Sequence, residues 1–97
     1  MSRTLPTIDD ICADILASGI RLGDYQRDLL LGRARWSGAD LKGNARKWGG
    51  RYKRSRDRVA DLIRDEAARK GVAVRWLGGT AKEGPLRPEV VGPLATW

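Results

Sequence analysis

Residues 51–71 read RYKRSRDRVADLIRDEAARKG and contain the clearest helical pattern in this 97-residue chain. Apolar side chains recur there at intervals of three, four and seven residues, namely Tyr52, Val59, Leu62, Ile63 and Ala67. This spacing places them on one face of an α-helix. Lys70 and Gly71 then form a typical helix end, with a cation in the last turn and a glycine stop. The pattern predicts an amphipathic helix that packs against a core.

The first third of the chain contains two predicted helices. Thr7 followed by Asp10 resembles a capping box, and isoleucines recur at helical spacing after it, so we expect a helix over residues 8–18. Asp24 is a typical N-cap, and the leucine-rich run that follows it ends near Gly32. The chain is therefore predicted to begin with two short helices.

Residues 37–48 are predicted to form a third helix, opened by Ser37 and ended by the glycine pair Gly49 and Gly50. Helical geometry would place three apolar residues of this segment on one face, namely Leu41, Ala45 and Trp48. This interpretation puts a turn at the glycine pair and starts a fourth helix at residue 51.

The last part of the chain is predicted to be extended. Residues 72–77 are rich in β-branched and aromatic side chains, which favours a strand. A region rich in glycine and proline separates them from a second extended segment, residues 86–91. Pro88 has no N–H to donate to a ladder, so this second segment is expected to be an edge strand or a tail.

The net charge of +7 is concentrated in the middle of the chain. Residues 1–32 carry a net charge of −2, residues 33–58 carry +8, and residues 59–97 carry +1. A charged segment is commonly only a solvated surface. Here, however, the opposite charges that would neutralise it are missing, and self-repulsion destabilises a small domain. We therefore interpret residues 33–58 as a segment that binds a polyanion.

Two helices joined by a glycine turn, the second of them basic, resemble the helix-turn-helix of bacterial and phage DNA-binding proteins. The residues that carry the resemblance are Leu41, Ala45, Gly49 and the segment 59–63, although this turn has two glycines where the family usually has one. A hairpin after these helices would make it a winged helix. The resemblance implies a mainly α, four-helix domain with a small wing-like C-terminal β-hairpin, whose helix-turn-helix is residues 37–71. It further implies a transcription regulator that binds duplex DNA as a homodimer.

The basic residues lie on both flanks of the predicted last helix, where they could contact the phosphates on both sides of a DNA groove. Arg51, Arg54 and Arg58 would line one flank, and Lys53 and Arg64 the other. The planar fork of arginine matches phosphate oxygens and the guanine edge. We expect Arg54 and Arg58 to contact bases and the remaining cations to contact phosphates. The predicted nucleic-acid-binding residues are Lys42, Arg46, Lys47, Arg51, Lys53, Arg54, Arg56, Arg58 and Arg64.

Four tryptophans and no phenylalanine give this chain an unusual aromatic composition. Trp36, Trp48 and Trp76 each adjoin an apolar pattern, so we expect them to be packing residues instead of platforms on which bases stack. Trp97 is expected either to fold back onto the domain or to contact a partner such as a second copy of the chain.

Length and composition indicate one small cytoplasmic domain. A chain this short has room for one core, so residues 1–97 are predicted to be a single domain with loose ends at residues 1–6 and 92–97. No apolar run approaches the roughly 18 residues that cross a bilayer, and Asp9 stands where a signal peptide would be basic or apolar. Cys12 has no partner for an internal disulfide, which fits a reducing compartment.

Catalysis and cofactor binding are not expected. The chain has no histidine and one cysteine, so the commonest general base and the usual zinc ligand sets are absent. Its serines match no nucleophile motif. Two alternatives to DNA binding remain open from the sequence. The chain could be a phage-type protein that inhibits a host nucleoprotein or defence complex, or an RNA-binding factor of the antitermination kind.

Overall fold

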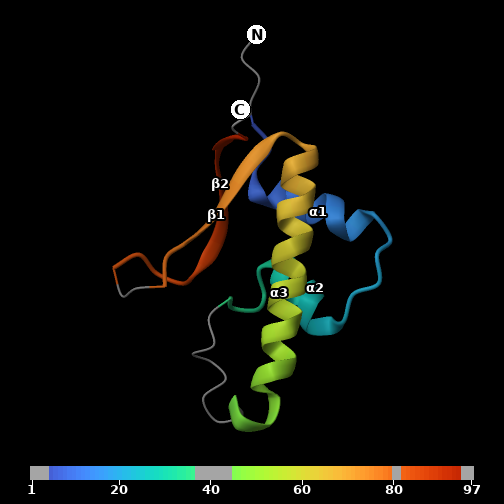
Figure 1. Cartoon of the computed structure of the whole chain (residues 1–97), viewed down its shortest axis with the longest axis vertical. Helices are drawn as coiled ribbons and strands as arrows, with labels where there is room; N and C mark the ends of the chain where they lie inside the picture. Colours follow the sequence, from blue (N-terminus) through green and yellow to red (C-terminus); the bar gives the residue numbers. More distant parts are fainter. Residues whose placement is uncertain (1–4, 37–44, 80–81, 95–97) are drawn as a thin grey trace.

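A computed structural model describes residues 5–36, 45–79 and 82–94, and of residues 45–52 it describes the helical backbone alone. These parts of the chain form three helices and a two-stranded antiparallel sheet, in the order α1 (Ile8–Ala17), α2 (Asp24–Leu31), α3 (Ala45–Arg69), β1 (Val72–Leu77) and β2 (Arg87–Pro93) (Figure 1). The fold is thus a small mixed α/β arrangement, and the prediction of a mainly α, four-helix domain is wrong.

The long helix α3 overturns the predicted helix-turn-helix. Its 25 residues continue through Gly49 and Gly50, where the sequence pattern predicted a turn between two helices. Glycine lowers helix propensity by about 1 kcal/mol relative to alanine but does not by itself stop a helix. The part of the predicted third helix at residues 37–44 lies outside the described residues.

The first two helices form close to where the sequence predicted them. The Thr7 hydroxyl accepts a hydrogen bond from the Asp10 N–H, and the Asp10 carboxylate accepts one from the Thr7 N–H, so the predicted capping box is confirmed. In α2 the N-cap is Gly23, one residue before the predicted Asp24, and its N–H donates to the Gln26 side chain at 3.1 Å. Gly32 ends α2 with φ of 75°, a conformation that favours glycine.

One apolar core joins the three helices and β1, and Val90 of β2 packs against it. Buried side chains of α1 and α2 meet the C-terminal half of α3 and the first residue of β1, the set being Ile11, Cys12, Ile15, Leu29, Leu30, Val59, Ile63, Ala67 and Val72. Val59, Ile63 and Ala67 follow one another at four-residue intervals, as the predicted amphipathic face requires. Every buried residue that the structure describes on α3 lies at or after position 59.

The two predicted extended segments pair as a hairpin. Val74 lies opposite Val90, and Trp76 lies opposite Pro88, with a register shift between Ala73 and Val74. Each strand has only one neighbour, so Pro88 occupies an edge strand, as its missing N–H requires. The hairpin packs beside the C-terminal half of α3 and then projects away from the helices (Figure 1).

The end of β2 is attached to the end of α3. β2 runs to Pro93, two residues beyond the predicted strand. The N–H of Leu94 then donates to the carbonyl of Gly71 at 2.8 Å. This hydrogen bond holds the described end of the chain next to the turn that connects α3 to β1.

Candidate nucleic-acid interface

The N-terminal half of α3 extends beyond the apolar core. We call residues 45–58 the basic arm. In Figure 1 this part of α3 is coloured green and continues past α2, away from α1 and from the turn into β1. An α-helix rises 1.5 Å per residue, so the basic arm is about 21 Å long. The arrangement separates a charged helical segment from the half of the same helix that builds the core.

The two halves of α3 differ in charge. The basic arm contains seven lysine and arginine residues and one aspartate, a net charge of +6. Residues 59–69 contain two arginines and three carboxylates, a net charge of −1. The positive charge of α3 therefore belongs almost entirely to its N-terminal half, whereas the buried residues described on α3 lie in its C-terminal half.

Two arginines at the inner end of the basic arm are hydrogen-bonded to α2. The Arg58 guanidinium donates to the Gln26 side-chain oxygen at 2.7 Å. The Arg56 guanidinium donates to the Tyr25 hydroxyl at 3.5 Å, and that hydroxyl donates to the Arg35 carbonyl at 3.4 Å. Arg56 is half-buried and therefore serves mainly to join α3 to α2. Arg58 stays exposed, and Gln26 fixes its orientation while leaving other N–H donors available.

Among the described cations of the basic arm, Lys53 and Arg54 are the ones that other described residues do not engage. Both side chains are exposed, and neither makes a hydrogen bond or an ion pair with any residue that the structure describes. Arg54 lies four residues before Arg58, so the two are neighbours on the helix surface. Of the two residues expected to contact bases, Arg54 is available and Arg58 is partly engaged.

Arg64 contacts the hairpin and a neighbouring carboxylate. Its guanidinium lies 4.8 Å from the centre of the Trp76 ring and 3.8 Å from the Asp61 carboxylate. Trp76 in turn contacts Trp36 edge to face, with ring centres 5.5 Å apart. Both rings are half-buried, which confirms the packing role expected for Trp36 and Trp76. Arg64 lies about three turns after Lys53, on the same side of α3, but its guanidinium is already engaged by Trp76 and Asp61.

Carboxylates begin at the inner end of the basic arm and continue beyond it. Asp57, Asp61 and Asp65 are exposed at four-residue intervals along α3. Cations beyond residue 58 are largely paired with carboxylates: Arg69 with Glu66, Lys70 with Asp14 and Glu66, and Arg87 with Glu89. The pairing neutralises the rest of the described surface and leaves the basic arm as its positive end.

Four predicted residues have side chains that cannot be placed on this surface. Lys42 lies outside the described residues, and Arg46, Lys47 and Arg51 lie in α3 where the structure describes the backbone alone. The structure therefore brings together Lys53, Arg54, Arg56 and Arg58, within six consecutive positions. Trp48 and Trp97 likewise have no described side chain.

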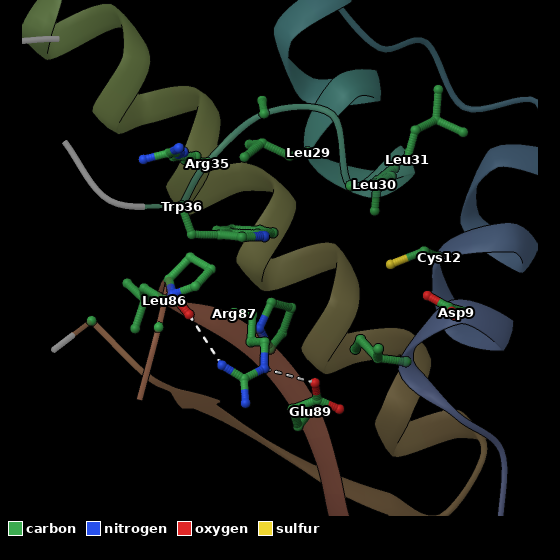
Figure 2. A pocket seen from close by; sticks show the side chains of 17 residues that line it. Asp9, Cys12, Leu29, Leu30, Leu31, Arg35, Trp36, Leu86, Arg87 and Glu89 are labelled. Carbon is green, nitrogen blue, oxygen red and sulfur yellow. Dashed lines mark hydrogen bonds and ion pairs between the residues drawn. The ribbon is translucent and has the colours of Figure 1, made fainter. Parts of the chain in front are cut away.

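A separate groove lies between the helices and the hairpin. It has a volume of about 730 Å³ and is lined mostly by apolar residues of α1, α2, the segment after α2, the connection between the strands and the start of β2. Figure 2 shows Trp36 and Leu86 on one side of it and Cys12 and Asp9 on the other. Its charged residues are two arginines and two carboxylates, Asp9, Arg35, Arg87 and Glu89. The groove is therefore neutral and does not favour a polyanion. Sequence reasoning missed it because its walls come from segments far apart in the chain.

Cys12 is a packing residue, as the sequence predicted. Its side chain is buried in the core at 7% exposure. Burial, and to a smaller extent the charge of Asp9, raises the pKa of the thiol to about 11. A thiol with such a pKa stays protonated at neutral pH and is a poor nucleophile.

Comparisons with known proteins place the chain in no family. No protein-family model matches the sequence, and searches of curated proteins and solved structures gave no significant match. Within the described residues, no three histidine, cysteine or carboxylate side chains gather to form a metal site. No helix in the same residues combines the length and the apolar character that a membrane span requires.

Proposed function

We propose that this chain binds duplex DNA through the basic arm and acts as a DNA-binding regulator. The observation that carries the proposal is the net charge of +6 on the N-terminal half of α3, next to a C-terminal half with a net charge of −1. A charge segregated in this way creates a local field that attracts a polyanion. The proposal therefore depends on the arm and not on the overall net charge.

Duplex DNA fits the shape of the basic arm. The major groove admits an α-helix, and a helix of about 21 Å spans roughly six base pairs at 3.4 Å per pair. Phosphates flank such a helix on both sides. Lys53 and Arg54 lie on different sides of α3 because successive residues of a helix are about 100° apart. A helix that enters a groove can use both.

Arg54 is the best candidate for a base contact. It is exposed, and its guanidinium is not engaged by any described residue. Arginine can donate two hydrogen bonds to the O6 and N7 atoms of guanine, an interaction that contributes about 1–3 kcal/mol of discrimination against other bases. Arg58, held by Gln26, is better suited to a phosphate at a fixed distance.

The experiment is a fluorescence-anisotropy titration of labelled duplex DNA at several salt concentrations. If the basic arm contacts about five phosphates, log K should fall with log salt at a slope near −4 to −5. Parallel titrations with single-stranded DNA and with RNA test the partner class. Tighter binding to RNA than to duplex DNA, or a salt-independent affinity, would overturn the proposal.

A pair of matched variants locates the binding surface. Lys53→Ala/Arg54→Ala removes two charges from the basic arm, whereas Arg21→Ala/Arg75→Ala removes two exposed charges from elsewhere. The arm variant should reduce the magnitude of the salt slope by about 2, since each lost phosphate contact contributes about 0.9. The control should keep the wild-type slope. Equal losses for both variants would indicate nonspecific attraction by the whole molecule and would exclude the arm as the site.

A further inference from the structure

The Gln26 side chain joins α2 to the basic arm through its oxygen atom. Its Oε1 accepts one hydrogen bond from the Gly23 N–H at 3.1 Å and a second from the Arg58 guanidinium at 2.7 Å. An N–H group and a guanidinium only donate, so the oxygen of the amide faces them and its nitrogen points away from them. The two hydrogen bonds therefore fix the orientation of the whole amide group.

The amide nitrogen of Gln26 is available to an acceptor outside the chain. An amide NH2 group has two N–H donors, and no residue that the structure describes accepts a hydrogen bond from this one. Gln26 is half-buried, and no described side chain of that kind has a buried polar atom without a partner, so this nitrogen is accessible from solvent.

Arg58 adds further donors at the same place. Its guanidinium has five N–H groups, and the contact with Gln26 uses one of them. None of the described carboxylates forms an ion pair with Arg58, so its charge is not neutralised within the described part of the chain. Arg58 and Gln26 thus present a cation and a neutral donor next to each other.

We propose that Gln26 and Arg58 together bind one backbone phosphate of the duplex, so that α2 forms part of the DNA interface. This inference rests on the proposed function of the basic arm. Phosphate oxygens accept hydrogen bonds from both guanidinium and amide groups, and hydrogen bonds to a charged group are the stronger ones. A base is a poorer partner, because the bidentate contact of glutamine with adenine needs the side-chain oxygen, which two donors already occupy.

The phosphate site is assembled before DNA binds. Consecutive residues of α2 hold two arginines of α3, since the Tyr25 hydroxyl accepts from Arg56 as the Gln26 oxygen accepts from Arg58. Side chains that must be ordered on binding lower the affinity, and side chains that are already fixed avoid most of this cost. Phosphate contacts set the position of a protein on the duplex. The Gln26–Arg58 pair therefore determines how the basic arm is placed along the DNA backbone.

The first test observes the Gln26 amide directly. Gln26 is the only glutamine in the chain, so selective 15N labelling of glutamine side chains gives one pair of NH2 resonances in an NMR spectrum. Titration of the wild-type protein with the duplex should shift both resonances, with the dissociation constant that fluorescence anisotropy gives. Resonances that do not move while the duplex binds would overturn the inference.

The second test replaces Gln26 by glutamate. Gln26→Glu keeps acceptor oxygens for the α2 cap and for Arg58, but it replaces the NH2 donors by a charged oxygen. Duplex affinity should fall at least about tenfold, and the salt slope should lose about 0.9 in magnitude, because Arg58 is then paired with a carboxylate. Ala13→Glu is the matched control: Ala13 is exposed on α1, away from the basic arm (Figure 1), so affinity should change by less than about twofold.

A double-mutant cycle separates a direct phosphate contact from simple positioning of Arg58. If the Gln26 amide touches the phosphate, Gln26→Ala should still weaken duplex binding by at least about threefold when Arg58 has already been replaced by alanine. If Gln26 acts only through Arg58, the same substitution has no further effect in that background. This second result would overturn the inference.

The outcomes separate this inference from the proposed function. Failure of the wild type to bind duplex DNA overturns both. Duplex binding with a steep salt slope, together with unmoved Gln26 resonances or with equal affinities for Gln26→Glu and Ala13→Glu, overturns the inference alone. Because the NMR measurement uses the wild type, it decides the question even if a variant does not fold.

Discussion

Replacing Ile63 by alanine tests whether α3 is held by its C-terminal half. Ile63 is fully buried at the centre of the core. The substitution removes three carbon atoms, at about 0.8 kcal/mol each, and leaves a cavity, so we expect a loss of about 3–4 kcal/mol in the free energy of unfolding. A domain of this size is typically stable by 5–15 kcal/mol, so the variant should still fold.

Urea denaturation followed by tryptophan fluorescence measures this loss, because Trp36 and Trp76 pack against the same core. With an m value of about 1–3 kcal/mol/M, the midpoint should fall by roughly 1–4 M. Ile20→Ala is the matched control: Ile20 is 37% exposed and outside the helices, so its loss should be below about 1 kcal/mol. A difference of less than 1 kcal/mol between the two variants would refute the placement of the core on residues 59–67.

Two further predictions concern α1. Above pH 9, the unfolded state loses the Cys12 proton while the folded state, with a pKa of about 11, keeps it, so stability should fall by up to about 3 kcal/mol by pH 11. Cys12→Ala should lack this part of the alkaline loss in unfolding experiments run at successive pH values, and an identical pH profile in both proteins would contradict the assignment. Thr7→Ala should lower the free energy of unfolding by about 1 kcal/mol, because the capping hydrogen bond to Asp10 is lost. Thr7→Ser keeps the hydroxyl and should behave like the wild type in the same urea titration, so equal losses in both variants would argue against the cap.

Local patterns in the sequence predicted most of the elements. The capping box at Thr7, the glycine end of α2 and the β-branched run from Val72 each depend on neighbouring residues, and all three are found in the structure. Gly49 and Gly50 were ambiguous because two glycines allow a turn without imposing one. The sequence alone does not say which state the rest of the chain stabilises.

The charged site could be predicted only in part. The density of cations at residues 45–58 is a property of the sequence, and so is their separation from the apolar positions that follow. The position of Arg64 over Trp76 depends on how the hairpin packs against α3, which helical periodicity cannot reveal. The hydrogen bond of Arg58 to Gln26 joins residues 32 positions apart, so helical periodicity could not predict it either.

The hydrogen bond between Leu94 and Gly71 sets the distance between the described C-terminal end of the chain and the basic arm, and this distance can be measured. It fixes position 94 at the far end of α3, and 25 residues at 1.5 Å per residue put that position about 37 Å from Ala45. A fluorophore attached there should give weaker energy transfer to a dye on the bound duplex than a fluorophore at position 53 gives. For the same reason, tethering the protein to a sensor chip through this end leaves the opposite tip turned toward the solution.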